Sequence, residues 1–155
     1  MTDHELLVLV AGALVNVTEC PPNTNKGLKV EEMLALCSLA PGNPWCAAYV
    51  AYVGRTAWGA RWPLKLVGGC VSLWEDGKAK AMDSPSPVAG GIFLVYHPEV
   101  KRLAHTGFIV RANADGSFVT REGNTSGGGS REGWGVFERT RTFKPEDRFL
   151  FPVPL

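Results

Sequence analysis

One cysteine of this chain occupies a position where a thiol becomes reactive. The segment 40–43 is a sharp break, and the sequence after it predicts a helix from Pro44 to about Trp58. Asn43 suits the cap of this helix and Pro44 its first position, which places Cys46 in the first turn. Unpaired N–H groups and the positive end of the helix dipole favour a thiolate there. Cys46 is therefore a candidate nucleophile, although its position alone fits a core cysteine equally well.

The remaining cysteines give no sign of a zinc site or of disulfides. Cys20, Cys37 and Cys70 are spread along the chain, and no pair of cysteines has the short spacing of zinc ligands. We expect all three to be free thiols that behave as small hydrophobic residues.

A thiolate nucleophile requires a base, and the chain offers three histidines. His4 fits a solvated position at the start of the first helix, and His97 precedes Pro98 in a predicted hairpin loop. His105 begins a strand, with Gly107 on the same face, so that space beside the imidazole could admit a substrate. His105 is thus the candidate base, and a structural histidine is the alternative.

Two polar residues lie one hairpin later and could orient the histidine. Glu122 and Asn124 are two residues apart at a predicted strand end, so both can face the same side. Either could accept the N–H of His105, as the third member of a catalytic triad does. The alternative is an ordinary turn at Glu-Gly-Asn.

The elements that must position these residues indicate an α+β fold in one domain, residues 1–155. Thr2 and Glu5 form a predicted capping box for the first helix. Helices are predicted at 3–16, 28–39, 44–58 and 65–77, and strands at 92–96, 104–111, 117–122, 136–141 and 148–153. Residues 113–116 supply a turn. The order predicts N-terminal helices packed on a C-terminal antiparallel sheet of about five strands.

Composition excludes several classes of function. A net charge of +1 argues against a nucleic-acid-binding protein. The longest apolar run, Leu6 to Val15, is too short to cross a membrane. No Lys or Arg precedes Lys26, so a secretory signal is not predicted, and we expect synthesis in the cytoplasm.

Several motifs together resemble the CHAP family (cysteine, histidine-dependent amidohydrolases/peptidases). Residues 43–50 (NPWCAAYV) resemble its nucleophile motif, 105–110 (HTGFIV) its histidine strand, and 122–126 (EGNTS) its Glu-Gly-Asn signature. Residues 23–30 and 135–141 resemble segments before and after these, so the likeness covers about residues 19–141. One departure is Ala-Gly-Gly at 89–91, where the family usually has Pro-Gly-Asp.

The resemblance implies a papain-like fold and a peptidoglycan hydrolase, as in phage endolysins. Carried over by position, Cys46 is the nucleophile, His105 the base, and Glu122 and Asn124 the orienting and polar partners. The substrate bond would be N-acetylmuramoyl-L-alanine or an amide within the stem peptide. Residues 40–45 lack the carboxylates with which some members bind calcium, so no metal or other cofactor is expected.

The groove around the nucleophile and the role of the chain are further expectations. Trp45 adjoins Cys46 and could line the groove. The loop 126–133, which begins with Ser126 and Gly127, could act as a flap that shapes the groove. We expect a monomer that reaches the cell wall after release or delivery by another system. The alternatives are a cysteine amidase acting on another amide and a non-catalytic structural or wall-binding domain of a phage particle.

Overall fold

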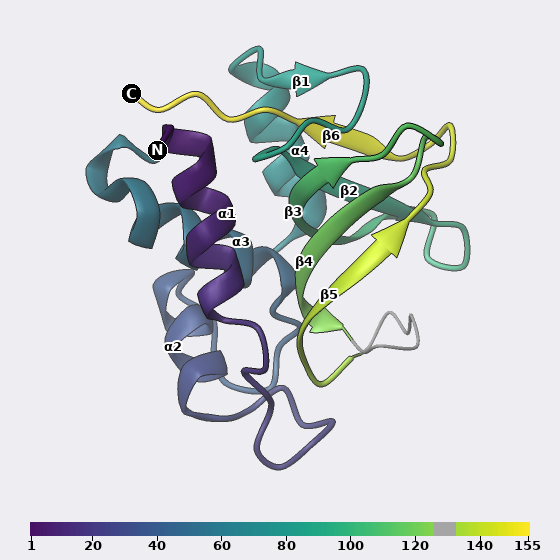
Figure 1. The fold of residues 1–155 in the computed structure, drawn as a ribbon. Helices are drawn as coiled ribbons and strands as arrows, with labels where there is room; N and C mark the ends of the chain where they lie inside the picture. Colours follow the sequence, from purple (N-terminus) through teal and green to yellow (C-terminus); the bar gives the residue numbers. More distant parts are fainter. Residues whose placement is uncertain (126–132) are drawn as a thin grey trace.

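A computed structural model describes residues 1–125 and 133–155 of the chain. Helices fill the N-terminal half and a sheet the C-terminal half, which confirms the predicted α+β class (Figure 1). The helices are α1 (Asp3–Ala13), α2 (Leu28–Leu36), α3 (Cys46–Trp58) and α4 (Cys70–Ala79), with a short 3-10 turn η1 (Gly59–Arg61). The strands are β1 (Asp83–Ser84), β2 (Ile92–His97), β3 (Arg102–Ala112), β4 (Phe118–Thr125), β5 (Gly135–Arg141) and β6 (Arg148–Leu150).

The strands form one antiparallel sheet in the order β1-β6-β2-β3-β4-β5. It has six strands, one more than predicted, because the two residues of β1 pair with β6 at the edge. The turn at 113–116 joins β3 to β4 as predicted. Since β3 and β4 form a hairpin inside the sheet, flanked by β2 and β5, the residues of these two strands lie side by side.

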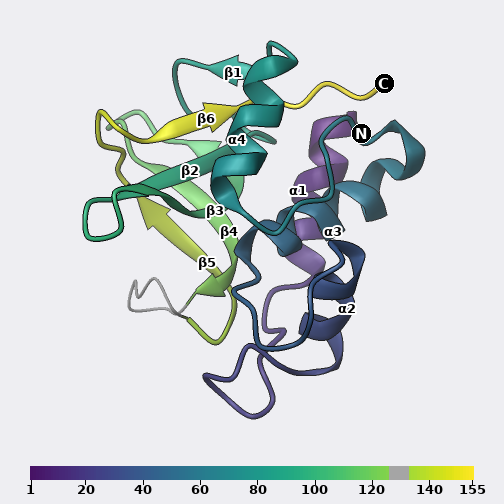
Figure 2. The same ribbon diagram turned by 180° about the vertical axis from the view of Figure 1, so that it is seen from behind.

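Helix α3 is the centre of the fold. It contacts α1 and α2 on its helical side and β3 and β4 on the side of the sheet (Figures 1 and 2). Nine of its residues are buried, and Ala47, Ala48 and Ala51 are small enough to allow close approach of these neighbours. The helix that carries the candidate nucleophile is therefore fixed on several sides.

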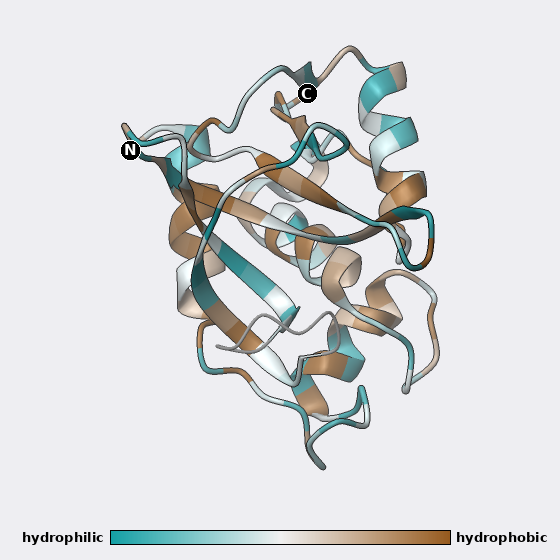
Figure 3. Ribbon diagram, turned by 90° about the vertical axis from the view of Figure 1, so that its right-hand side faces the viewer, coloured by the Kyte–Doolittle hydropathy of each residue, from teal (hydrophilic) through white to brown (hydrophobic). Residues whose placement is uncertain are grey.

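Hydrophobic residues form two clusters on opposite faces of the sheet. The larger one joins the helices to Ile92, Leu94 and Phe108, and the smaller one consists of Phe93, Ile109, Phe118 and Phe149. Figure 3 shows the long strands of the sheet passing in front of the central helix. Hydrophobic residues lie on the strands and on the helix. The strands β2 and β3 are therefore covered by apolar side chains on both faces.

Some predicted helix limits were wrong. The first two helices end three residues earlier than predicted, and α4 runs from Cys70 to Ala79 instead of 65–77. It begins only at Cys70, after Gly68 and Gly69, because glycine is unfavourable inside a helix. The Thr2–Glu5 capping box is confirmed. His4 is not simply solvated: its ring stacks on Phe151 and its Nε2 lies 2.8 Å from the carbonyl oxygen of Pro152.

Candidate active site

Cys46 is the first residue of α3, where its thiol lies at the N-terminal end of the helix. The start of this helix differs from the prediction, because the cap is Trp45 and not Asn43. The Trp45 carbonyl accepts the Tyr49 N–H at 2.8 Å, whereas the Asn43 side chain donates to the carbonyl of Ala40 at 2.9 Å. Cys46 nevertheless stands in the first turn, as expected.

Trp45 does not line the groove, which corrects the expectation. Its side chain is fully buried, and its indole Nε1 donates to the carboxylate of Glu19 at 2.9 Å. Glu19 in turn accepts the backbone N–H of Thr24. Trp45 therefore anchors the start of α3, next to the thiol, to the loop between α1 and α2.

His105 lies on β3 and contacts a carboxylate on β4. Its Nε2 is 2.7 Å from Oε1 of Glu122, and both side chains are buried. The pairing of β2 with β3 shifts register between Val95 and Tyr96, immediately beside His105. Bulges of this kind redirect side chains at active sites. Of the two residues proposed to orient the histidine, the structure thus places Glu122 in contact with it.

Glu122 is itself held by two side chains that the sequence analysis did not single out. Arg141 on β5 donates two hydrogen bonds to its carboxylate, and the hydroxyl of Thr120 donates another. Burial alone would raise the pKa of Glu122, but Arg141 and His105 hold it well below its usual value. Glu122 is therefore a carboxylate. Thr120 is two residues from Glu122 on one strand, so strand periodicity could have indicated it.

The thiol of Cys46 and the imidazole of His105 influence each other's protonation. A hydrogen bond from Cys70, the neighbouring imidazolium of His105 and the backbone N–H of Ala47 hold the pKa of Cys46 well below its usual value, against burial. Burial lowers the pKa of His105, but Cys46 and Glu122 outweigh it and raise this pKa to about 9. The Nδ1 atom makes no hydrogen bond within the described residues, so this nitrogen is free for the thiol. The arrangement favours a thiolate–imidazolium pair at neutral pH.

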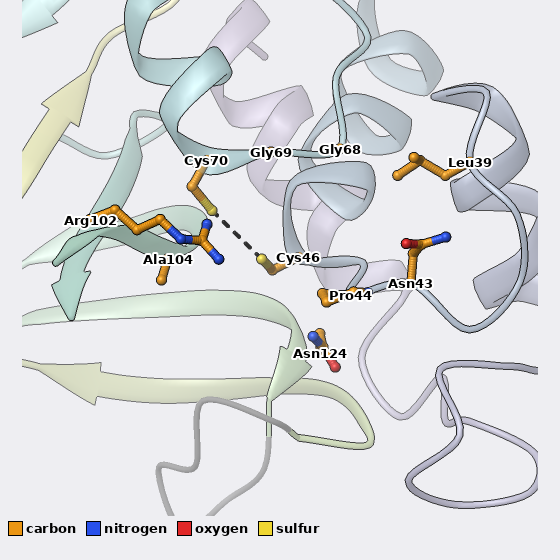
Figure 4. A pocket seen from close by; sticks show the side chains of 10 residues that line it. All are labelled: Leu39, Asn43, Pro44, Cys46, Gly68, Gly69, Cys70, Arg102, Ala104 and Asn124. Atoms are coloured by element: carbon orange, nitrogen blue, oxygen red, sulfur yellow. Dashed lines mark hydrogen bonds between the residues drawn. The ribbon is translucent and has the colours of Figure 1, made fainter. Parts of the chain in front are cut away.

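A cavity of about 310 Å³ opens beside the thiol (Figure 4). Its walls come from the segment before α3, the start of α4, β3 and the end of β4. The lining residues are Leu39, Asn43, Pro44, Cys46, Gly68, Gly69, Cys70, Arg102, Ala104 and Asn124. The nucleophile candidate is thus reached from solvent through this cavity.

Two residues of the cavity were not anticipated. The Sγ atoms of Cys46 and Cys70 are 3.8 Å apart, and Arg102 lies over the same space (Figure 4). Among the described residues, Arg102 has no ion-pair partner. Neither Cys70 nor Arg102 lies in a sequence motif of the site. They come close to Cys46 because the fold places the start of α4 and the start of β3 beside it.

Asn124 lines the cavity, and no hydrogen bond joins it to His105 within the described residues. Its backbone is left-handed, with φ of 54°, and its Oδ1 is buried without a hydrogen-bond partner in the described part of the chain. Buried polar atoms without a partner are rare in native proteins. The amide oxygen of Asn124 is therefore a candidate acceptor for a bound substrate.

Gly107 does not provide the open space that was expected beside the imidazole. A Cβ atom added at Gly107 would lie 2.7 Å from the carbonyl oxygen of Arg121 and 2.9 Å from the ring of Phe93. The glycine instead permits close packing of β3 on β4. The remaining predicted groove residues, Ser126 and Gly127, lie outside the described residues.

The described residues contain no group of three potential metal ligands and no helix long and apolar enough to cross a membrane. By their geometry, Cys46, His105 and Glu122 are the candidates for nucleophile, base and orienting carboxylate.

The state of Cys46 can be measured against an internal control. Burial raises the pKa of Cys37 to about 11, whereas that of Cys46 is lowered. We expect iodoacetamide at pH 6 to alkylate Cys46 and leave Cys37 unmodified, as measured by peptide mass spectrometry. In the denatured chain both should react alike. Failure of Cys46 to react in the native protein would show an inert core thiol and would favour a non-catalytic domain.

Comparison with known proteins supports the same assignment. The family model of the CHAP domain matches residues 39–124, more than half of the chain, and this range contains Cys46, His105 and Glu122. Comparison with curated proteins and with solved structures gives no match. The family implies an amidohydrolase or peptidase that depends on cysteine and histidine. On this match and on its fold, the chain belongs to the CHAP domain family.

Proposed function

We propose that this protein hydrolyses an amide bond of peptidoglycan with Cys46 as the nucleophile. The observation that carries the proposal is that the Cys46 thiol borders the cavity, that Cys46 and His105 shift each other's pKa, and that the Glu122 carboxylate lies 2.7 Å from His105 Nε2. The family match supports the reaction class and points to a substrate of the peptidoglycan type.

The mechanism follows from the protonation states. The Cys46 thiolate attacks the carbonyl carbon of the amide and forms a tetrahedral oxyanion. The backbone N–H of Cys46, at the free end of α3, is the candidate donor to this oxyanion. His105, held as an imidazolium by Glu122, then protonates the leaving amine. The neutral imidazole takes a proton from water, which attacks the thioester carbonyl; the C–S bond breaks, and the thiolate–imidazolium pair is restored with the free acid as product.

The cavity walls suit a polar and acidic peptide. Asn124 offers a side-chain amide and Arg102 a positive charge within the space that adjoins the thiol. Stem peptides of peptidoglycan carry free carboxylates, which a guanidinium binds well. We assign Arg102 and Asn124 to substrate binding on this basis. Whether the bond cut is N-acetylmuramoyl-L-alanine or an amide within the stem peptide depends on which part of the substrate enters this space.

A digest of purified sacculi tests the proposal. We expect the protein to release soluble fragments, identified by mass spectrometry, from sacculi of at least one stem-peptide chemotype. New N-terminal alanine with free muramic acid carboxyl groups would indicate an amidase, and new termini within the peptide would indicate an endopeptidase. The digest uses unmodified protein from a preparation in which a separate sample shows alkylation of Cys46 at pH 6. No release from any of several chemotypes by this unmodified protein would contradict the peptidoglycan assignment and favour another amide substrate.

A further inference from the structure

The second thiol at the nucleophile is the feature that the proposed mechanism does not use. Cys46 and Cys70 are the first residues of α3 and α4, and the two helix starts face each other across the cavity (Figure 4). Their Sγ atoms are 3.8 Å apart, and both cysteines are reduced. A disulfide has an S–S distance of about 2.05 Å, so the two sulfur atoms need to approach by less than about 2 Å.

We propose that Cys46 and Cys70 form a reversible disulfide that switches off the nucleophile when the protein meets a peroxide. Cys70 would be the resolving cysteine, a residue that protects the nucleophile from irreversible oxidation. The loss and recovery of activity rest on the proposed function, whereas formation of the disulfide does not.

The chemistry balances in two steps. The Cys46 thiolate attacks hydrogen peroxide, the O–O bond breaks, and Cys46 becomes a sulfenic acid as hydroxide leaves. The Cys70 sulfur, as it loses its proton, attacks the Cys46 sulfur, and the S–O bond breaks with release of water. Two thiols lose two electrons in total, and one peroxide is reduced to two waters. A dithiol reductant reverses the change by thiol–disulfide exchange and is itself oxidised to a disulfide.

The surroundings assign different roles to the two thiols. Cys46 carries the features of a reactive thiolate, as described above, and hence reacts first. The hydrogen bond to Cys46 and burial keep Cys70 protonated, which preserves it as the second reactant. The guanidinium of Arg102 acts in the opposite direction and eases loss of the Cys70 proton. Both residues border the open cavity, which gives a small oxidant access.

The experiment treats the full-length reduced protein with a small excess of hydrogen peroxide, quenches it by alkylation and maps the peptides. We expect a mass loss of two hydrogens and a peptide pair joined through Cys46 and Cys70. Dithiothreitol should restore both free thiols and, with them, hydrolysis of sacculi. Cys20→Ala serves as the matched control, because it removes the exposed thiol outside the site and should give the same cross-link.

Cys70→Ala separates a resolving cysteine from a bystander. In this variant we expect Cys46 to gain two or three oxygen atoms under the same treatment, with no recovery of the thiol by dithiothreitol. Because the readout is a mass, it holds even if the variant or the wild type proves inactive on sacculi. Equal over-oxidation of Cys46 in wild type and Cys70→Ala, with no peptide joined through the two cysteines, would overturn the proposal.

Discussion

Cys46→Ala abolishes hydrolysis while the protein stays folded; this is the largest effect we expect. The substitution removes the only atom that forms the proposed thioester, so turnover should fall by roughly four to six orders of magnitude. The sulfur is buried, and its loss should cost about 1 kcal/mol of stability, which leaves the native state in place. The measurement is the rate of fragment release from sacculi, with the melting temperature recorded for each variant.

The matched control for this variant is Cys37→Ala. Cys37 is also a buried thiol, but it caps the end of α2 and does not border the cavity. We expect Cys37→Ala to lose a comparable amount of stability and to keep the wild-type rate. A Cys46→Ala protein that cleaves at the wild-type rate would remove Cys46 from the mechanism, and equal losses in both variants would point to stability alone.

The sequence predicted those parts of the site that depend on residues close together in the chain. Cys46 was assigned to a first helical turn from the break before it, and His105 and Glu122 were assigned to adjacent strands of a hairpin. Neighbouring antiparallel strands bring such residues side by side whatever the rest of the fold does. The same reasoning left Glu122 and Asn124 as alternatives, because strand periodicity does not determine which of two side chains bends toward a neighbour.

The residues that were missed are those placed by long-range packing. Arg141 binds Glu122 because β5 pairs with β4, and Cys70 approaches Cys46 because α4 begins beside β3. Neither contact follows from spacing along the chain. Trp45 and Gly107 were misassigned to the groove because burial is a tertiary property: Glu19 draws the indole inward, and Phe93 fills the space beside the glycine.

Glu122→Gln is expected to have the second largest effect, and it tests whether Glu122 acts through His105. The amide still fills the space, but it removes the charge that favours the imidazolium and that pairs with Arg141. We expect the rate to fall by about 10²- to 10⁴-fold. Removing one partner of a buried ion pair should also cost about 3–5 kcal/mol of stability, so a melting curve must show that the variant is folded at the assay temperature.

The pH profile separates positioning from structure in this variant. The active form requires protonated His105, whose pKa is about 9, so wild-type activity should decline as the pH rises through about 9. In Glu122→Gln the imidazolium loses its carboxylate partner, its pKa falls, and this decline should move to lower pH. The measurement is kcat/KM on sacculi fragments from pH 5 to 10, a range that covers the decline in both the wild type and the variant.

Two further variants give this experiment its contrast. Glu138→Gln breaks an exposed ion pair with Arg121 and should change neither the rate nor the pH at which activity declines. Asn124→Ala, at the cavity wall, should lower the rate less than Glu122→Gln and leave that pH unchanged, because no hydrogen bond joins Asn124 to His105 within the described residues. If Asn124→Ala loses more activity than Glu122→Gln, and if activity declines at the same pH in Glu122→Gln as in the wild type, the orienting role belongs to Asn124. The 2.7 Å contact between His105 and Glu122 is the reason to expect the opposite order, since a buried carboxylate that touches an imidazole sets its charge whether or not substrate is bound.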